Sequence, residues 1–166
     1  WFKMSKENIL FKFFGIIFLI FSLYTTYYLR EYVGLNFIIF VILICVFTDI
    51  GGYIFGKTLN GPKLTKISPK KTYAGVMGSF IFALIAGFTY NEYFFQNEIS
   101  QLQIILIIFL ISLVSQVGDL IISYFKRKAK MKDSGKMLPG HGGLLDRIDG
   151  LIFVFPILYL CNFILV

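Results

Sequence analysis

The sequence is poor in charge, in histidine and in cysteine. Only 15% of its 166 residues are charged, against about 25% in a typical soluble domain. Its one histidine, His141, has neither cysteine nearby, which argues against a zinc site. The two cysteines, Cys45 and Cys161, lie in apolar runs, and their spacing does not suggest a disulfide. The shortage of charge, together with 57% hydrophobic residues, excludes an ordinary soluble domain and predicts an integral membrane protein.

Two further features are missing near the start of the chain. The first apolar run follows Lys3 and Lys6, but no small-residue cleavage site follows it, so a cleavable signal peptide is not expected. The chain also begins with Trp1 rather than Met. We therefore expect additional helices before it in the natural protein.

Five apolar stretches approach the roughly 20 residues that a membrane-spanning helix needs. They are continuous and lack the alternation of a barrel strand, so helices are expected. We predict an all-α, polytopic transmembrane helix bundle, a single integral membrane domain over residues 1–166. The expected spans are 9–29, 35–55, 73–90, 102–125 and 148–166.

Basic residues gather in alternate connections. With five spans, fifteen of the sixteen lysines and arginines lie on one side of the membrane, in the N-terminus and in the loops 56–72 and 126–147. Only Arg30 lies on the other side. Basic loops stay in the cytoplasm, so we expect both loops to be cytoplasmic and the C-terminus to lie on the opposite side. Topology and attraction to anionic lipid explain the net charge of +7, and no nucleic-acid partner is expected.

Two of the expected helices have a distinctive face. In 73–90, small residues recur every fourth position, which is typical of close helix packing in lipid: Gly75, Ser79, Ala83 and Gly87. In 102–125, polar residues share one stripe: Ser112, Ser115, Gln116, Asp119 and Ser123. A carboxylate within a span is costly and suggests function, although an ion pair of Asp119 with Lys126 or Arg127 is a purely structural alternative.

Acidic residues near the expected cytoplasmic face suggest a cation site. Asp146 and Asp149 are three residues apart, on one helix face, and can converge with Asp119. Negative charge at a helix N-terminus is the simpler explanation for that pair. Clustered carboxylates require a cation, and oxygen ligands favour Mg²⁺ with phosphate oxygens. With nearby lysines and a Pro-Gly-His-Gly-Gly turn at 139–143, the pattern indicates phosphoryl or nucleotidyl transfer.

One motif is misleading. Residues 51–58, GGYIFGKT, fit the P-loop pattern GxxxxGK[ST]. A P-loop follows a strand and opens a helix in a soluble domain, whereas this segment ends an expected membrane span. We therefore do not expect it to bind a nucleotide.

The polar loop resembles the signature of phosphatidate cytidylyltransferases, also called CDP-diacylglycerol synthases. The matching residues are Ser123, Lys126, Arg127, Lys132, Asp133, Gly135, the LPGHGG run at 138–143, Asp146, Arg147 and Asp149. Upstream, the Gly-Asp-Leu run at 118–120, residues 49–56 and the SPKKT run at 68–72 are also similar to the family. Ala74 departs from it, because an acidic residue is usual at that position.

The resemblance implies that CTP and phosphatidic acid react to give CDP-diacylglycerol and pyrophosphate in a bacterial inner membrane. It implies Mg²⁺ held by Asp119 and Asp146, with Asp149 beside them and Asp49 a weaker candidate, and leaves open a second cation and a homodimer. Catalytic roles fall to Asp119, Asp146, Lys126 and Arg147. Substrate contacts fall to Ser68, Lys70, Lys71, Ser123, Arg127, Lys132, His141, Gly142 and Gly143.

Three other functions remain open from the sequence. A CTP-dependent polyprenol or phytol kinase would share the metal and the basic residues but would leave a phosphorylated alcohol. A transporter or channel could use Asp49 and Asp119 in its path, and a non-catalytic protein could simply bind anionic lipid.

Overall fold

The computed structural model describes residues 9–59, 61–65, 68, 71–95, 100–131 and 148–165. Within these ranges, α3 continues into a short π-helix, η1 (Asn91–Phe95), and the only β pairing is an isolated bridge between Lys63 and Thr72. The predicted all-α fold is confirmed. The α-helices are α1 (Ile9–Tyr32), α2 (Leu35–Thr58), α3 (Tyr73–Tyr90), α4 (Gln101–Lys128) and α6 (Leu151–Leu165).

Four helical segments in the described ranges are long and apolar enough to cross a membrane: Phe13–Tyr32, Leu35–Thr58, Tyr73–Phe95 and Gln101–Lys128. They correspond to the first four predicted spans. The fifth is shorter than predicted, because Asp149 and Gly150 form a turn and α6 begins only at Leu151. α6 is apolar but has 15 residues, fewer than the roughly 20 that a simple span requires.

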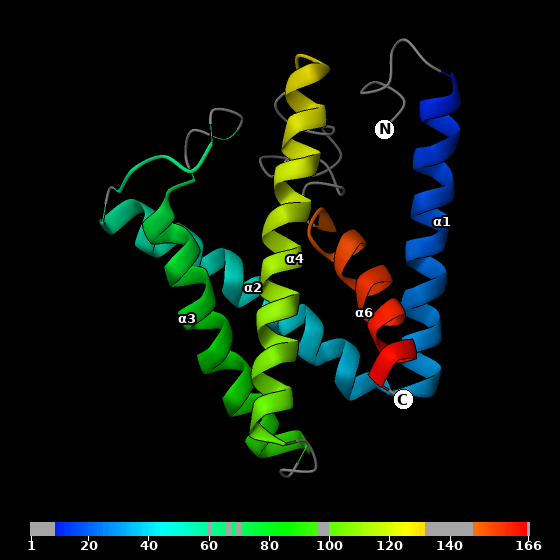
Figure 1. Ribbon diagram of the computed structural model, residues 1–166, viewed down its shortest axis with the longest axis vertical. Coiled ribbons are helices and arrows are strands. Elements are labelled where there is room, and N and C mark those ends of the chain that lie inside the picture. Colours follow the sequence, from blue (N-terminus) through cyan, green and yellow to red (C-terminus); the bar gives the residue numbers. More distant parts are fainter. Residues whose placement is uncertain are drawn as a thin grey trace, which may run out of the picture.

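The helices alternate in direction, and α4 runs through the middle of the bundle (Figure 1). α4 packs against α2, α3 and α6, while α1 packs against α6 and α2. The loop after α2, the C-terminal end of α4 and the start of α6 all lie toward the same end (Figure 1). The core is formed mainly where α2 meets α4, by fully buried residues that include Phe40, Val41, Ile44, Ile108 and Ile111.

Helix ends follow local sequence signals. Between α1 and α2, Gly34 has φ 107°, a left-handed conformation that favours glycine, and its N–H donates to the Leu29 carbonyl over 3.2 Å. Thr72 caps α3 by accepting a hydrogen bond from the Gly75 N–H over 3.1 Å. Ser100 and Gln103 form a capping box that starts α4.

Glycines allow α2 and α3 to pack backbone against backbone. A Cβ added at Gly75 would lie 2.8 Å from the Gly52 carbonyl oxygen, and one added at Gly51 would overlap the Gly78 carbonyl oxygen. The predicted stripe of small residues in α3 is confirmed, since all four of its members are buried. This contact fixes the segment of α2 that carries Thr48 and Asp49 against the rest of the bundle.

We expect Gly51→Ala to destabilise the protein by about 1–3 kcal/mol, because the new methyl group would meet main-chain atoms of α3 that have no room to move. Gly61→Ala is the matched control, because a Cβ there would make only an ordinary 3.4 Å contact with Ala74. Thermal unfolding in detergent measures both. Equal melting temperatures for the two variants would contradict the proposed packing.

Candidate active site

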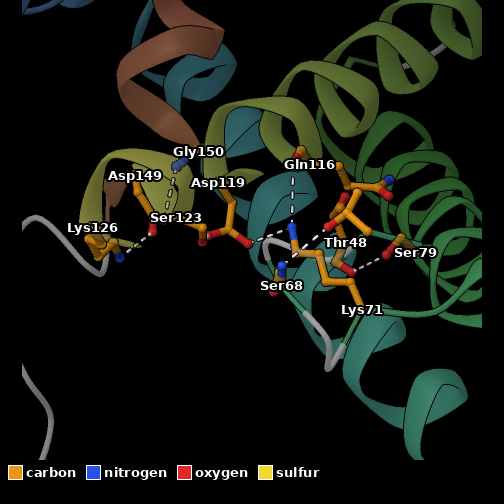
Figure 2. Close-up of polar contacts among 11 residues, drawn as sticks. Thr48, Ser68, Lys71, Ser79, Gln116, Asp119, Ser123, Lys126, Asp149 and Gly150 are labelled. Atoms are coloured by element: carbon orange, nitrogen blue, oxygen red, sulfur yellow. Dashed lines mark hydrogen bonds and ion pairs between the residues drawn. The ribbon is translucent and has the colours of Figure 1, made fainter. Parts of the chain in front are cut away.

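The site is built around Asp119 of α4, at the end of the bundle where the loop after α2 returns to it. Lys71 Nζ lies 2.5 Å from Asp119 Oδ2, and the same ammonium donates to the Gln116 carbonyl oxygen over 3.4 Å. Figure 2 shows Lys71 reaching between Asp119 and Gln116. The sequence suggested Lys126 or Arg127 as ion-pair partners of Asp119, but the recorded partner is Lys71 from a distant loop.

Short-range backbone hydrogen bonds hold Lys71 in place. The Lys71 carbonyl accepts from Leu64 N–H over 2.8 Å, and the Lys71 N–H donates to the Ser68 carbonyl over 3.0 Å. The Lys63–Thr72 bridge and the Tyr73 N–H bond to the Pro62 carbonyl, 3.1 Å, close the loop beside them. The loop therefore presents the lysine side chain to α4 from a fixed backbone.

A second ion pair joins α4 to the turn before α6. Lys126 Nζ lies 3.5 Å from Asp149 Oδ2, and the two side chains are only 10% and 15% exposed. The other Asp149 oxygen, Oδ1, accepts a hydrogen bond from the Gly150 N–H over 3.1 Å. Because both charges are nearly buried, water screens their attraction only weakly.

Asp119 and Asp149 lie close enough for their carboxyl groups to hydrogen-bond. Burial, and then the neighbouring Asp119 charge, raise the pKa of the Asp149 carboxyl, while the Lys126 ammonium lowers it. Asp49 of α2 is exposed, but it interacts electrostatically with Asp119 and Lys71. Three carboxylates from different segments thus share one region, with Lys71 and Lys126 as counter-charges.

The donor chemistry of this region fits a hard cation such as Mg²⁺, because Asp119 and Asp149 offer only carboxylate oxygens and lie close together. Within the described ranges, no three His, Cys, Asp or Glu side chains are close enough to share one ion. A cation would therefore contact Asp119 and Asp149 first. Asp146, the other predicted ligand, lies outside the described residues.

Two glycines bring the turn before α6 close to α4. A Cβ added at Gly118 would lie 2.7 Å from the Phe153 ring and 3.3 Å from the Asp149 carbonyl oxygen, and one at Gly150 would overlap Ser115 Oγ. This close approach places the Asp149 side chain beside α4. Sequence reasoning did not assign a role to Gly150, although its position directly after Asp149 was a signal.

The structure brings together part of the predicted site. Ser123 Oγ donates to Asp119 Oδ1 over 3.5 Å, Ser68 belongs to the loop that holds Lys71, and Arg127 is exposed on α4. Asp149 lies in a turn before α6, which corrects its prediction as part of that helix. The remaining predicted residues lie outside the described residues: Lys70, Lys132, His141, Gly142, Gly143, Asp146 and Arg147.

The P-loop-like segment does not form a phosphate-binding loop. Residues 51–58 are the helical C-terminal part of α2, which runs without interruption to Thr58. Their amides are therefore used within the helix, which confirms the interpretation from the sequence.

Comparison with known proteins identifies the family. Residues 2–165 match the model of the cytidylyltransferase family. The chain belongs to this family. Among its relatives, the phosphatidate cytidylyltransferase of Rickettsia bellii is 37% identical over 172 residues, which cover 98% of this chain and 73% of that protein.

Two other relatives in the cytidylyltransferase family carry the same name. The phosphatidate cytidylyltransferase of Bacillus subtilis is 42% identical and that of Staphylococcus aureus 42% identical, over 76% and 75% of this chain. The chain spans about half the length of these two proteins, 47% and 48%. The family resemblance inferred from the sequence is therefore confirmed.

The raised pKa of Asp149 predicts a pH-dependent stability. A carboxyl group whose pKa is higher in the folded protein than in the unfolded chain stabilises the fold at a pH below its unfolded pKa. This contribution is lost as the pH rises through the folded-state pKa, which is about 7 for Asp149. We expect the melting temperature in EDTA to fall between about pH 4 and pH 7, and Asp149→Asn to flatten that fall.

Glu92→Gln is the control for this titration, because Glu92 is exposed in η1, away from the site. It should keep the pH dependence of the unmodified protein. Parallel curves for Asp149→Asn and the unmodified protein would contradict the assignment.

Proposed function

We propose that this chain carries the catalytic centre of a phosphatidate cytidylyltransferase, which converts CTP and phosphatidic acid into CDP-diacylglycerol and pyrophosphate. The observation that carries the proposal is the pairing of acidic and basic side chains at one end of an apolar bundle, Lys71 with Asp119 and Lys126 with Asp149. Such a region can bind phosphates through its lysines and a cation through its carboxylates.

In this proposal, a phosphate oxygen of phosphatidic acid attacks the α-phosphorus of CTP. The bond from that phosphorus to the oxygen bridging the β-phosphorus breaks, and pyrophosphate leaves. The attacking phosphate is already ionised at neutral pH, so no side chain needs to act as a general base. The residues of this chain bind, orient and neutralise the two anions.

Lys71 and Lys126 are suited to the phosphates, and Asp119 and Asp149 to Mg²⁺, with Asp146 and Asp49 as further candidates. When bound, the cation would neutralise phosphate charge. In the structure the lysines already neutralise the carboxylates. We propose that the lysines turn to the substrate phosphates when Asp119 and Asp149 are occupied by a cation.

The position of Asp119 suits a lipid substrate, because α4 is an apolar helix long enough to cross a membrane. The acyl chains can therefore remain in the membrane while the lipid phosphate reaches the site. CTP would approach from the aqueous end of the bundle.

We propose an integral protein of the bacterial inner membrane with this end in the cytoplasm. Basic residues at this end support that orientation. Lys57 lies in the last turn of α2, Lys63 in the loop after it, and Lys126, Arg127 and Lys128 in the last turn of α4. The opposite end carries the connection between α1 and α2, with Arg30 and Glu31.

The decisive test uses the full-length protein in detergent with phosphatidic acid, Mg²⁺ and CTP labelled at either the α- or the γ-phosphorus. We expect the α-label to enter the lipid and the γ-label to leave in pyrophosphate. Asp119→Asn should lower the rate by about a hundredfold or more, because it removes a charge at the centre of the site.

Glu92→Gln is the matched control, since it neutralises an exposed carboxylate in η1 and should retain full activity. Transfer of the γ-label to lipid would instead identify a CTP-dependent lipid kinase. Absence of both labels from lipid, with folded protein, would contradict cytidylyl transfer to this substrate.

We expect Lys71→Met to raise the KM for CTP by about tenfold, because a charge-assisted contact to phosphate is lost. Lys63→Met is the control, because Lys63 is exposed in the same loop. Initial-rate kinetics over a range of CTP concentrations measure both. An equal increase for the two variants would show a general effect of loop charge and contradict a specific role for Lys71.

A further inference from the structure

Buried polar groups connect three helices next to the acidic region. Thr48 Oγ1 of α2 donates to Ser112 Oγ of α4 over 3.0 Å, and both residues are fully buried. Ser79 Oγ of α3 donates to the Thr48 carbonyl oxygen over 2.8 Å, and Gln116 Nε2 donates to Ser112 Oγ over 3.3 Å. We call Thr48, Ser79, Ser112 and Gln116 the polar network. Figure 2 shows three of its members, Thr48, Ser79 and Gln116, beside Lys71 and Asp119.

The polar network joins the backbone segments that carry the site. Thr48 directly precedes Asp49 in α2. Ser112 and Gln116 lie seven and three residues before Asp119, on the same face of α4. Lys71, the ion-pair partner of Asp119, also donates to the Gln116 carbonyl oxygen. The Thr48–Ser112 bond therefore links α2 to α4 close to Asp49 and Asp119.

This link opposes an electrostatic force. Asp49 and Asp119 interact as like charges, and the Lys71 ammonium offsets this interaction only in part. Such charges repel more strongly near a low-dielectric bundle than in water. Without a bound cation, the repulsion favours a wider separation of α2 and α4. A hydrogen bond between fully buried hydroxyl groups resists it, because neither group finds water if the bond opens.

We propose that Thr48 is a positioning residue whose hydrogen bond to Ser112 holds the carboxylates of α2 and α4 ready for a divalent cation. The inference rests on the proposed function only in requiring that the carboxylates bind such a cation. Without the bond, the cation-free protein relaxes, and binding must draw the helices together again. The free energy of cation binding then becomes less favourable by at most the free energy of the Thr48–Ser112 hydrogen bond.

A single substitution removes this bond and little else. Thr48→Val keeps the size and β-branching of the side chain, and the Ser79 bond to the main-chain carbonyl remains. The Gln116 bond to Ser112 also remains. Ser112→Ala removes the same Thr48 bond from the α4 side, so it serves if Thr48→Val does not fold.

The test measures binding of Mn²⁺ alone, by electron paramagnetic resonance, to the full-length protein in lipid nanodiscs. We expect Thr48→Val to weaken binding about threefold, the average strength of a hydrogen bond between membrane helices, and Thr48→Ser to restore it. The double variant Thr48→Val/Ser112→Ala should bind no more weakly than the weaker single variant, because each single variant already lacks the Thr48–Ser112 bond. The KM for phosphatidic acid should stay unchanged.

Thr89→Val is the matched control, because the exposed Thr89 hydroxyl bonds only the Ile85 and Ala86 carbonyls of its own helix. Asp119→Asn defines the site and should abolish the measured binding. Unchanged Mn²⁺ affinity in Thr48→Val, with binding lost in Asp119→Asn, would overturn the positioning role while the cation site stands. Binding in the unmodified protein that Asp119→Asn leaves intact would overturn both.

Discussion

Carboxylates placed among apolar helices need counter-charges, and this requirement organises the described structure. Asp119 and Asp149 lie close together, yet their recorded ion-pair partners come from different segments, Lys71 from the loop after α2 and Lys126 from α4. Leaving either carboxylate unpaired would be costly because little water reaches the Lys126–Asp149 pair. These pairs connect the loop after α2 to α4, and α4 to the turn before α6.

The same pairs of charges suit the proposed binding of two anionic substrates and a cation. In that proposal, a lysine that neutralises a carboxylate in the free protein turns to a phosphate when a cation binds the carboxylate. Membership of the cytidylyltransferase family agrees with such an arrangement of charges. Glycines allow the close packing that this arrangement needs. Gly51 and Gly75 let the backbones of α2 and α3 come into contact, and Gly118 and Gly150 let the turn before α6 pack closely against α4.

Sequence patterns predicted much of this molecule because they report local properties. The apolar runs identified the helices, the small residues of α3 identified its packing face, and Asp119 stood out as a charge within an apolar stretch. The start of the fifth helix was harder to predict, because Asp149 and Gly150 form a turn that packs against Ser115 and Gly118 of α4. The predicted roles of His141, Asp146 and Arg147 remain predictions.

The sequence by itself determined the all-α membrane class, the family and the polar stripe on α4, because hydropathy, periodicity and a long motif are readable along the chain. Only the tertiary structure decided that Lys71 pairs with Asp119 and that Thr48 bonds Ser112. These partners are far apart in sequence and meet only when loop and helices pack. Their pairing depends on distances between helices, which glycines and buried contacts set and which no local pattern encodes.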